Sequence, residues 1–130
     1  MRSTDTLKTT FDQLMNAFSA RDLEAVISLA HRDVVFLGVL APVSVIGRDA
    51  LRSFFRNFFD LHEHVKLTPL DPHFQVTDGI GLVWGSFLME VQPKRLERKT
   101  FYIRFSAALN QIDMTWRFLN MHTSWMPQEG

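Results

Sequence analysis

The order of patterns along the sequence predicts an α+β fold, with helices first and an antiparallel sheet after them. The N-terminal half carries apolar residues at helical spacing, whereas the C-terminal half carries long runs of β-branched and aromatic residues. Turn sequences such as "TDGIG" and "NQID" separate these runs. Because helices do not alternate with strands, the sheet is expected to be mostly antiparallel rather than built from βαβ units.

Three N-terminal helices are predicted from capping residues and apolar spacing. Apolar residues recur at helical spacing from Leu7 to Phe18, which indicates a helix over about residues 4–20. Asp22 is the expected N-cap of a short second helix. The segment "GRDALRSFFRNFFDLH" predicts a third helix near 48–61, with a wide phenylalanine-rich face.

The strands are predicted from short β-branched and aromatic segments. "DVVFLGVLA" indicates a strand near 33–40. In the loop that follows, the sequence does not decide between a short strand at 43–46 and irregular structure. "LHEHVKLTP" is interpreted as the end of the third helix and a connection. Beyond it, the strand candidates are "HFQV", "GLVWGSFLMEV", "RKTFYIRFSAAL" and "MTWRFLNMHTSW".

The long strands carry bulky side chains on both faces. By the period of two, the last strand separates into two sets: Arg117, Leu119, Met121, Thr123 and Trp125, against Trp116, Phe118, Asn120, His122 and Ser124. Three helices can cover only one side of such a sheet. An apolar second face usually packs on another subunit, so we expect a homodimer through the outer face.

Composition narrows the classes of function. The 130 residues suit a single domain, 1–130. Lys plus Arg equals Asp plus Glu at 14 each, so neither nucleic acid nor an acidic membrane is an expected partner. There is no cysteine, and therefore no disulfide or thiolate chemistry. The N-terminus lacks an apolar stretch, so a cytoplasmic location is expected.

Four stretches together resemble the SnoaL-like branch of the nuclear-transport-factor-2-like superfamily. They are "FSARDLEAVISLAHRDVVFLG", "GRDALRSFF", "GLVWGSF" and "WRFLNMHTSWMP". The resemblance implies a cone, in which three helices pack on a strongly curved sheet and leave a cavity. It also implies dimers formed through the outer face of the sheet, where Phe118 and His122 would meet the second copy.

The resemblance does not carry over the chemistry of ketosteroid isomerases. Those enzymes use an aspartate base and two donors to the oxyanion. The corresponding positions here are Leu14, Leu37, and Phe105 or Ser106. The arginines in the cavity of the related kinase association domain correspond to Leu88 and Thr123, so that anion site is not expected either.

The resemblance implies a mostly apolar pocket with a few polar anchors, typical of small-molecule sites. The expected lining residues are Leu14, Phe18, Leu37, Trp84, Ser86, Leu88, Met121 and Thr123. Arg104 is a candidate anchor for a carboxylate, with pairing to Glu90 or exposure to solvent as alternatives. His122 is expected on the opposite face, in the dimer interface.

The leading hypothesis is therefore a protein that binds a small, largely apolar molecule. A cyclase or isomerase-like enzyme with a substitute acid or base is a second hypothesis, with Asp12, His31, Glu90 and His122 as candidates. A third is an oligomerisation module without a ligand. The segment with His62, Glu63, His64 and His73 is interpreted as a polar helix end rather than a metal site, and no cofactor is expected.

Overall fold

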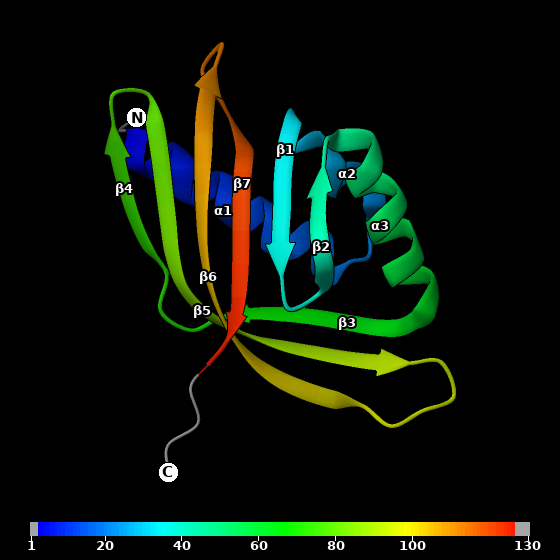
Figure 1. The fold of residues 1–130 in the computed structure, drawn as a ribbon. Helices are drawn as coiled ribbons and strands as arrows, with labels where there is room; N and C mark the ends of the chain where they lie inside the picture. The colour runs from blue at the N-terminus through cyan, green and yellow to red at the C-terminus, as the bar shows by residue number, and fades with distance from the viewer. Residues whose placement is uncertain (1–2, 127–130) are drawn as a thin grey trace.

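Three helices lie on one side of a curled, seven-stranded mixed sheet (Figure 1). The structure is a computed structural model that describes residues 3–126. Its helices are α1 (Ser3–Ser19), α2 (Leu23–Ser28) and α3 (Arg48–Leu61). Its strands are β1 (Ala30–Gly38), β2 (Ala41–Ile46), β3 (His62–Pro69), β4 (His73–Thr77), β5 (Ile80–Pro93), β6 (Lys99–Ile112) and β7 (Thr115–Trp125).

The last strand of the chain lies in the middle of the sheet. The strand order is β2-β1-β7-β6-β5-β3, and β4 pairs separately with β5. β7 runs parallel to β1, and every other pair is antiparallel. The predicted α+β class and the mostly antiparallel sheet are thus confirmed.

The three predicted helices are confirmed close to their expected bounds. The Asp22 carboxylate accepts a hydrogen bond from the Ala25 N–H at 3.2 Å, as its N-cap position predicts. α3 begins after Gly47 and ends at Leu61. The segment that follows it was interpreted wrongly, because His62–Pro69 forms strand β3. Only Val65 is deeply buried in β3, so the alternation of apolar and polar residues that indicates a strand is weak in this segment.

β5 changes its partner at Gly85, and this change bends the sheet. Residues 80–84 of β5 pair with β4, and residues 87–93 pair with β3. Gly85 has a φ of +149°, and a Cβ at this position would overlap the Asp71 carbonyl of the β3–β4 connection. Glycine therefore lets the connection cross directly over the strand.

The core fills the space between α1 and the inner face of the sheet. Phe11 is fully buried and packs against Phe105 and Phe74, with ring centroids 5.5 and 5.7 Å away. The buried Trp116 ring donates a hydrogen bond from Nε1 to the Thr6 hydroxyl at 2.9 Å. These contacts attach α1 to β4, β6 and β7.

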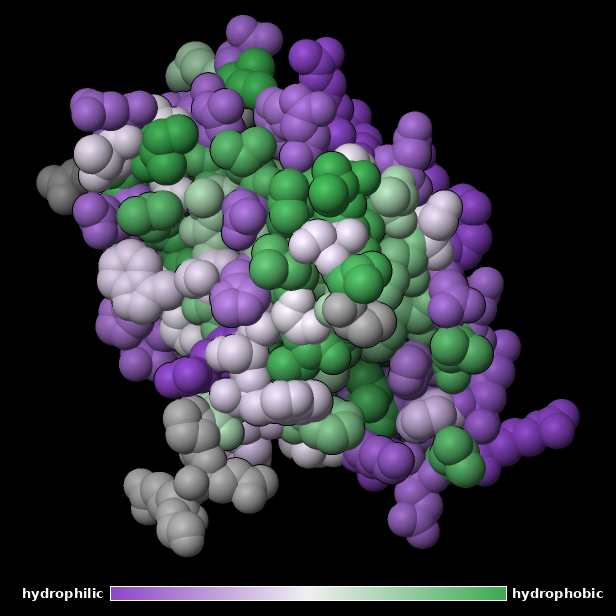
Figure 2. All heavy atoms as spheres, viewed as in Figure 1, coloured by the Kyte–Doolittle hydropathy of each residue, from purple (hydrophilic) through white to green (hydrophobic). Residues whose placement is uncertain are grey.

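The opposite face of the sheet carries no helix. α1 runs behind the strands in Figure 1, so the same view in Figure 2 looks onto the uncovered outer face. Hydrophobic residues are mixed with polar ones across this face in Figure 2. Leu82, Trp84 and Tyr102 lie here with exposed side chains. Within residues 3–126, no helix has the length and apolar character needed to cross a membrane.

Candidate functional site

An apolar hollow lies between the helices and the inner face of the sheet. It has a volume of about 60 Å³. Its lining comes from all three helices, from strands β1, β3, β5 and β7, and from the β1–β2 turn: Leu14, Met15, Phe18, Val26, Ala30, Val34, Phe36, Leu40, Leu51, Phe55, Leu67, Phe87, Met89, Phe118, Met121 and Thr123. Since roughly 10–15 Å³ is enough for one water molecule, the hollow has room for about four water-sized groups.

Phenylalanines from α1, α3 and β1 form one wall of the hollow. The Phe18 ring meets those of Phe55 and Phe59 edge to face, at centroid distances of 5.2 and 5.0 Å. Phe55 also packs against Phe36 of β1 at 5.4 Å. Such geometry places the positive edge of one ring against the negative face of the next, which holds the wall in one arrangement.

Thr123 is the one lining residue that bears a hydroxyl. Its side chain is 3% exposed, and its Oγ1 accepts a hydrogen bond from the Val39 N–H at 3.2 Å. Gly38 lies directly against this threonine, where a Cβ would overlap its hydroxyl and backbone. The hydroxyl oxygen of Thr123 is therefore occupied by the backbone of the turn between β1 and β2. None of the lining residues is titratable, so none of them can serve as a general acid or base.

Four of the residues expected to line the pocket do so: Leu14, Phe18, Met121 and Thr123. The prediction that the other four face the hollow is wrong: Leu37, Trp84, Ser86 and Leu88. Arg104, whose facing the sequence left open, is exposed to solvent, which was one of its alternatives. On β5, β6 and β1, the inward residues are the immediate sequence neighbours of those expected. Phe36, Phe87 and Phe105, for example, are each at most 5% exposed. A shift of one residue exchanges the two faces of a strand.

A β-bulge explains why strict alternation fails along β7. Phe118 pairs with Leu109, but Asn120 pairs with Ala108, which leaves Leu119 as an extra residue. Trp116 and Phe118 therefore point inward before the bulge, while Met121 and Thr123 point inward after it. The prediction that Trp116 and Phe118 lie on the outer face is wrong for this reason.

Arg104 and His122 lie on the outer face of the sheet, beside an open groove of about 430 Å³. Arg104 is exposed and is flanked in register by Ser86 and Ser124. The alternative pairing of Arg104 with Glu90 does not occur. His122 is on the face that the sequence predicted for it.

None of the four acid/base candidates lines the hollow: Asp12, His31, Glu90 and His122. Glu90 instead accepts a hydrogen bond from His64 at 2.8 Å, with Arg98 at 3.9 Å. The His64 hydrogen bond holds the pKa of the Glu90 carboxyl below its usual value, and the positive charge of Arg98 acts in the same direction.

The histidine-rich segment is divided among separate contacts. The His62 ring is 2.7 Å from the Phe58 carbonyl, His64 pairs with Glu90, and His73 lies 3.2 Å from an Asp71 carboxylate oxygen. Within residues 3–126 no three His, Cys, Asp or Glu side chains converge in a way that could hold a metal ion.

The curled sheet and its helices define the chain as a cystatin-like α+β fold of the nuclear-transport-factor-2-like type. Solved structures share it over nearly their whole length. A nuclear transport factor 2-like superfamily protein from Salmonella enterica is 11% identical, has a TM-score of 0.88, and matches over 98% of this chain and 94% of its own. An uncharacterized protein with a cystatin-like fold from Caulobacter vibrioides is 14% identical, has a TM-score of 0.83, and matches over 96% and 90%.

A ketosteroid isomerase-like protein from Erwinia carotovora is similar at 16% identity, with a TM-score of 0.82 and 98% of each chain covered. At these identities the likeness shows the fold alone. The family model of the SnoaL-like domain matches residues 7–129, and the chain belongs to this family. No curated protein matches the sequence.

Proposed function

We propose that this protein binds a small, largely apolar molecule in the hollow. The observation that carries the proposal is the lining, which contains aliphatic, aromatic and thioether side chains, one threonine and no charged residue. Apolar cavities of this kind stay dry and take up hydrocarbon ligands, because water finds no hydrogen-bond partners there. The volume favours a ligand no larger than a single ring, or one end of a longer chain.

Binding is favoured over catalysis by a substitute acid or base. General acid–base chemistry needs a titratable group within hydrogen-bond reach of the substrate. Asp12, His31, Glu90 and His122 all lie outside the lining.

A thermal-shift experiment with small apolar probes tests the proposal. We would titrate benzene and toluene into the wild-type protein and into Ala30→Leu, which adds a branched side chain inside the hollow. A ligand at ten times its Kd stabilises the folded state by about 1.4 kcal/mol, which is roughly a 5 °C rise in Tm for a domain of this size. At least one probe should raise the Tm of the wild type, and Ala30→Leu should reduce that rise.

Ala107→Leu is the matched control. Ala107 is a buried core residue, but it does not line the hollow. Its variant should lose stability by overpacking yet keep the response to the probe, if it remains folded. If no probe raises the Tm of the wild type, or if Ala30→Leu responds as the wild type does, the binding proposal fails and an oligomerisation module without a ligand becomes the better interpretation.

We further propose that two copies pair through the outer face. The support is the uncovered sheet, on which Leu82, Trp84 and Tyr102 are exposed, with Trp84 at 40%. Light scattering at micromolar concentration should give the mass of a dimer, and Trp84→Glu should shift it toward the monomer. A monomeric wild type would refute this pairing.

A further inference from the structure

We propose that a second site, separate from the hollow, binds the phosphate group of a small phosphate monoester. It is an open groove of about 430 Å³ at the end of the sheet where β1, β7 and α3 all begin, at the top of Figure 1. Its lining residues are His31, Arg32, Arg48, Ile112, Asp113, Thr115 and Arg117. None of these residues lines the hollow, so the inference does not depend on the apolar ligand.

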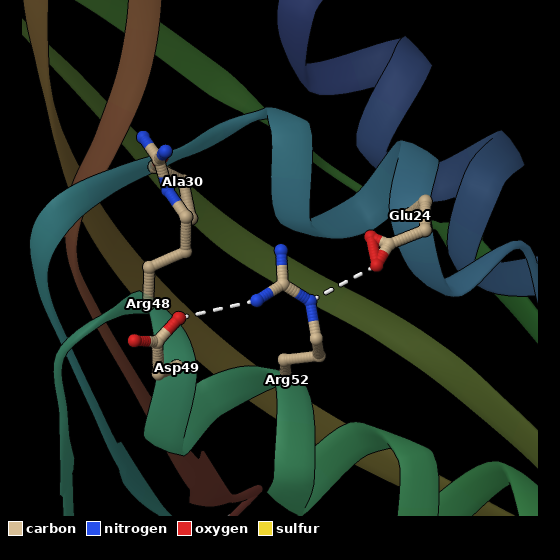
Figure 3. Close-up of polar contacts among 5 residues, drawn as sticks. All are labelled: Glu24, Ala30, Arg48, Asp49 and Arg52. Atoms are coloured by element: carbon tan, nitrogen blue, oxygen red, sulfur yellow. Dashed lines mark hydrogen bonds and ion pairs between the residues drawn. The ribbon is translucent and has the colours of Figure 1, made fainter.

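Two arginines on α3 differ in how their charge is compensated. Figure 3 shows Arg52 between the carboxylates of Glu24 and Asp49, at 2.9 and 3.1 Å. Arg48, one turn earlier, extends instead toward the start of β1. There its Nε and Nη2 donate to the Ala30 carbonyl at 3.1 and 2.7 Å. Within the described part of the chain, Arg48 forms no ion pair with a carboxylate.

Arg117 repeats this arrangement from β7. Its Nη1 donates to the Ser28 carbonyl at 2.6 Å, and it too makes no ion pair with a carboxylate among residues 3–126. A guanidinium has five N–H donors. Arg48 uses two of them on Ala30, and Arg117 uses one on Ser28. Both half-buried groups are therefore fixed in position by backbone carbonyls while most of their donors stay available.

His31 adds an imidazole ring to the same groove. Its side chain is 16% exposed, and its Nδ1 accepts a hydrogen bond from the Asp33 N–H at 3.0 Å. With Nδ1 taken up by this bond, Nε2 is the ring nitrogen left for a ligand.

The carboxylates near the groove do not cancel its charge. Asp33 lies 3.7 Å from Arg32 and compensates that exposed residue. Asp113 is the one acidic residue in the lining, which also contains Arg48 and Arg117. The groove is therefore net positive on a chain with equal numbers of acidic and basic residues, and this charge favours an anion as its ligand.

Phosphate is the anion that this donor set fits best. Two guanidiniums, each with several free N–H groups, match the several oxygens of a phosphate dianion, and arginine binds such groups with two parallel hydrogen bonds. The groove is open, so the rest of a small metabolite can extend into solvent.

Titration with inorganic phosphate and with glycerol 3-phosphate, at constant ionic strength maintained with chloride, tests the proposal. Backbone amide NMR of the wild type should show shifts that saturate, grouped at residues 30–33, 47–49 and 113–117. Arg48→Gln and Arg117→Gln should each weaken binding by about tenfold or more, as expected for the loss of hydrogen bonds to a charged group. Arg48→Lys should keep part of the affinity. Arg52→Gln is the matched control on the same helix face and should bind within about twofold of the wild type.

The relative affinities identify the source of the phosphate. Tighter binding of glycerol 3-phosphate than of inorganic phosphate supports a monoester, whereas the reverse order overturns that assignment in favour of free phosphate. Shifts that do not saturate, shifts grouped elsewhere, or equal weakening by Arg52→Gln and Arg48→Gln would overturn the site itself. The NMR arm uses the wild type alone, so the conclusion does not depend on whether a glutamine variant folds.

Discussion

Replacing Phe18 with alanine should destabilise the protein strongly and enlarge the hollow. The ring is 5% exposed and lies within 6 Å, centroid to centroid, of the rings of Phe55, Phe58 and Phe59. Truncation of a buried phenylalanine costs about 3–5 kcal/mol, and three aromatic neighbours favour the upper part of that range. With about 2.1 cal/mol/K of unfolding entropy per residue, 130 residues give about 0.27 kcal/mol/K, so 4 kcal/mol lowers the Tm by roughly 15 °C.

Differential scanning calorimetry of Phe18→Ala and Phe58→Ala measures this effect. Phe58 belongs to the same aromatic cluster but is only half-buried and does not line the hollow, so its variant should lose less than half as much. Benzene should restore more stability to Phe18→Ala than to Phe58→Ala, because only the former adds its lost volume to an existing cavity. A Phe18→Ala protein that unfolds within 4 °C of the wild type would refute the packing described for this wall.

Three further predictions concern single positions. Gly85→Ala should lower the Tm by about 7 °C or more in a thermal melt, because strain at its φ of +149° costs about 2 kcal/mol before the overlap with the Asp71 carbonyl is counted. Asp22→Ala should cost about 1 kcal/mol in urea unfolding through the lost N-cap, and an unchanged midpoint would argue against that role. The hydrogen bond from His64 lowers the pKa of the Glu90 carboxyl in the folded protein. The ionised carboxylate therefore stabilises the folded state above the pKa that Glu90 has in the unfolded chain, and this stabilisation is lost as the pH falls through the pKa of Glu90 in the folded protein. The difference in urea midpoint between wild type and Glu90→Gln should therefore be larger at pH 7 than at pH 3, and a constant difference would contradict it.

The helices could be predicted from the sequence because their signals are local. Asp22 stands at the N-cap of α2, and the apolar residues of α1 and α3 recur at helical spacing. β3 could not be predicted in the same way. Its buried face contributes one fully buried residue, Val65, and its remaining positions read as the polar end of a helix. Its strand character comes from pairing with β5 rather than from its own composition.

The facing of the strands was harder to predict than their existence. β5 carries Val83, Phe87 and Met89 inward, but it also carries Trp84 and Leu88 outward, so hydrophobicity does not distinguish its two faces. The lining of the hollow is drawn from three helices, four strands and one turn, and no local spacing marks such a set. Positions on α1 were predicted correctly because a helix face is fixed by several residues at once.

The bulge in β7 illustrates why a single extra residue has a large effect. Leu119 has no individual partner on β6, yet it decides which side chains of the following six residues face the hollow. A sequence pattern of period two contains no mark for such an insertion, and only the pairing with β6 reveals it.

The central place of β7 also bears on how the protein is made. β1 and β6 have no contact as neighbours until residues 115–125 insert between them, parallel to one and antiparallel to the other. During synthesis β1 and β6 must therefore wait, each with an open edge, until residues 115–125 have left the ribosome. Such long-range pairing folds slowly, and premature termination before Thr115 would leave edges prone to aggregation rather than a smaller folded protein.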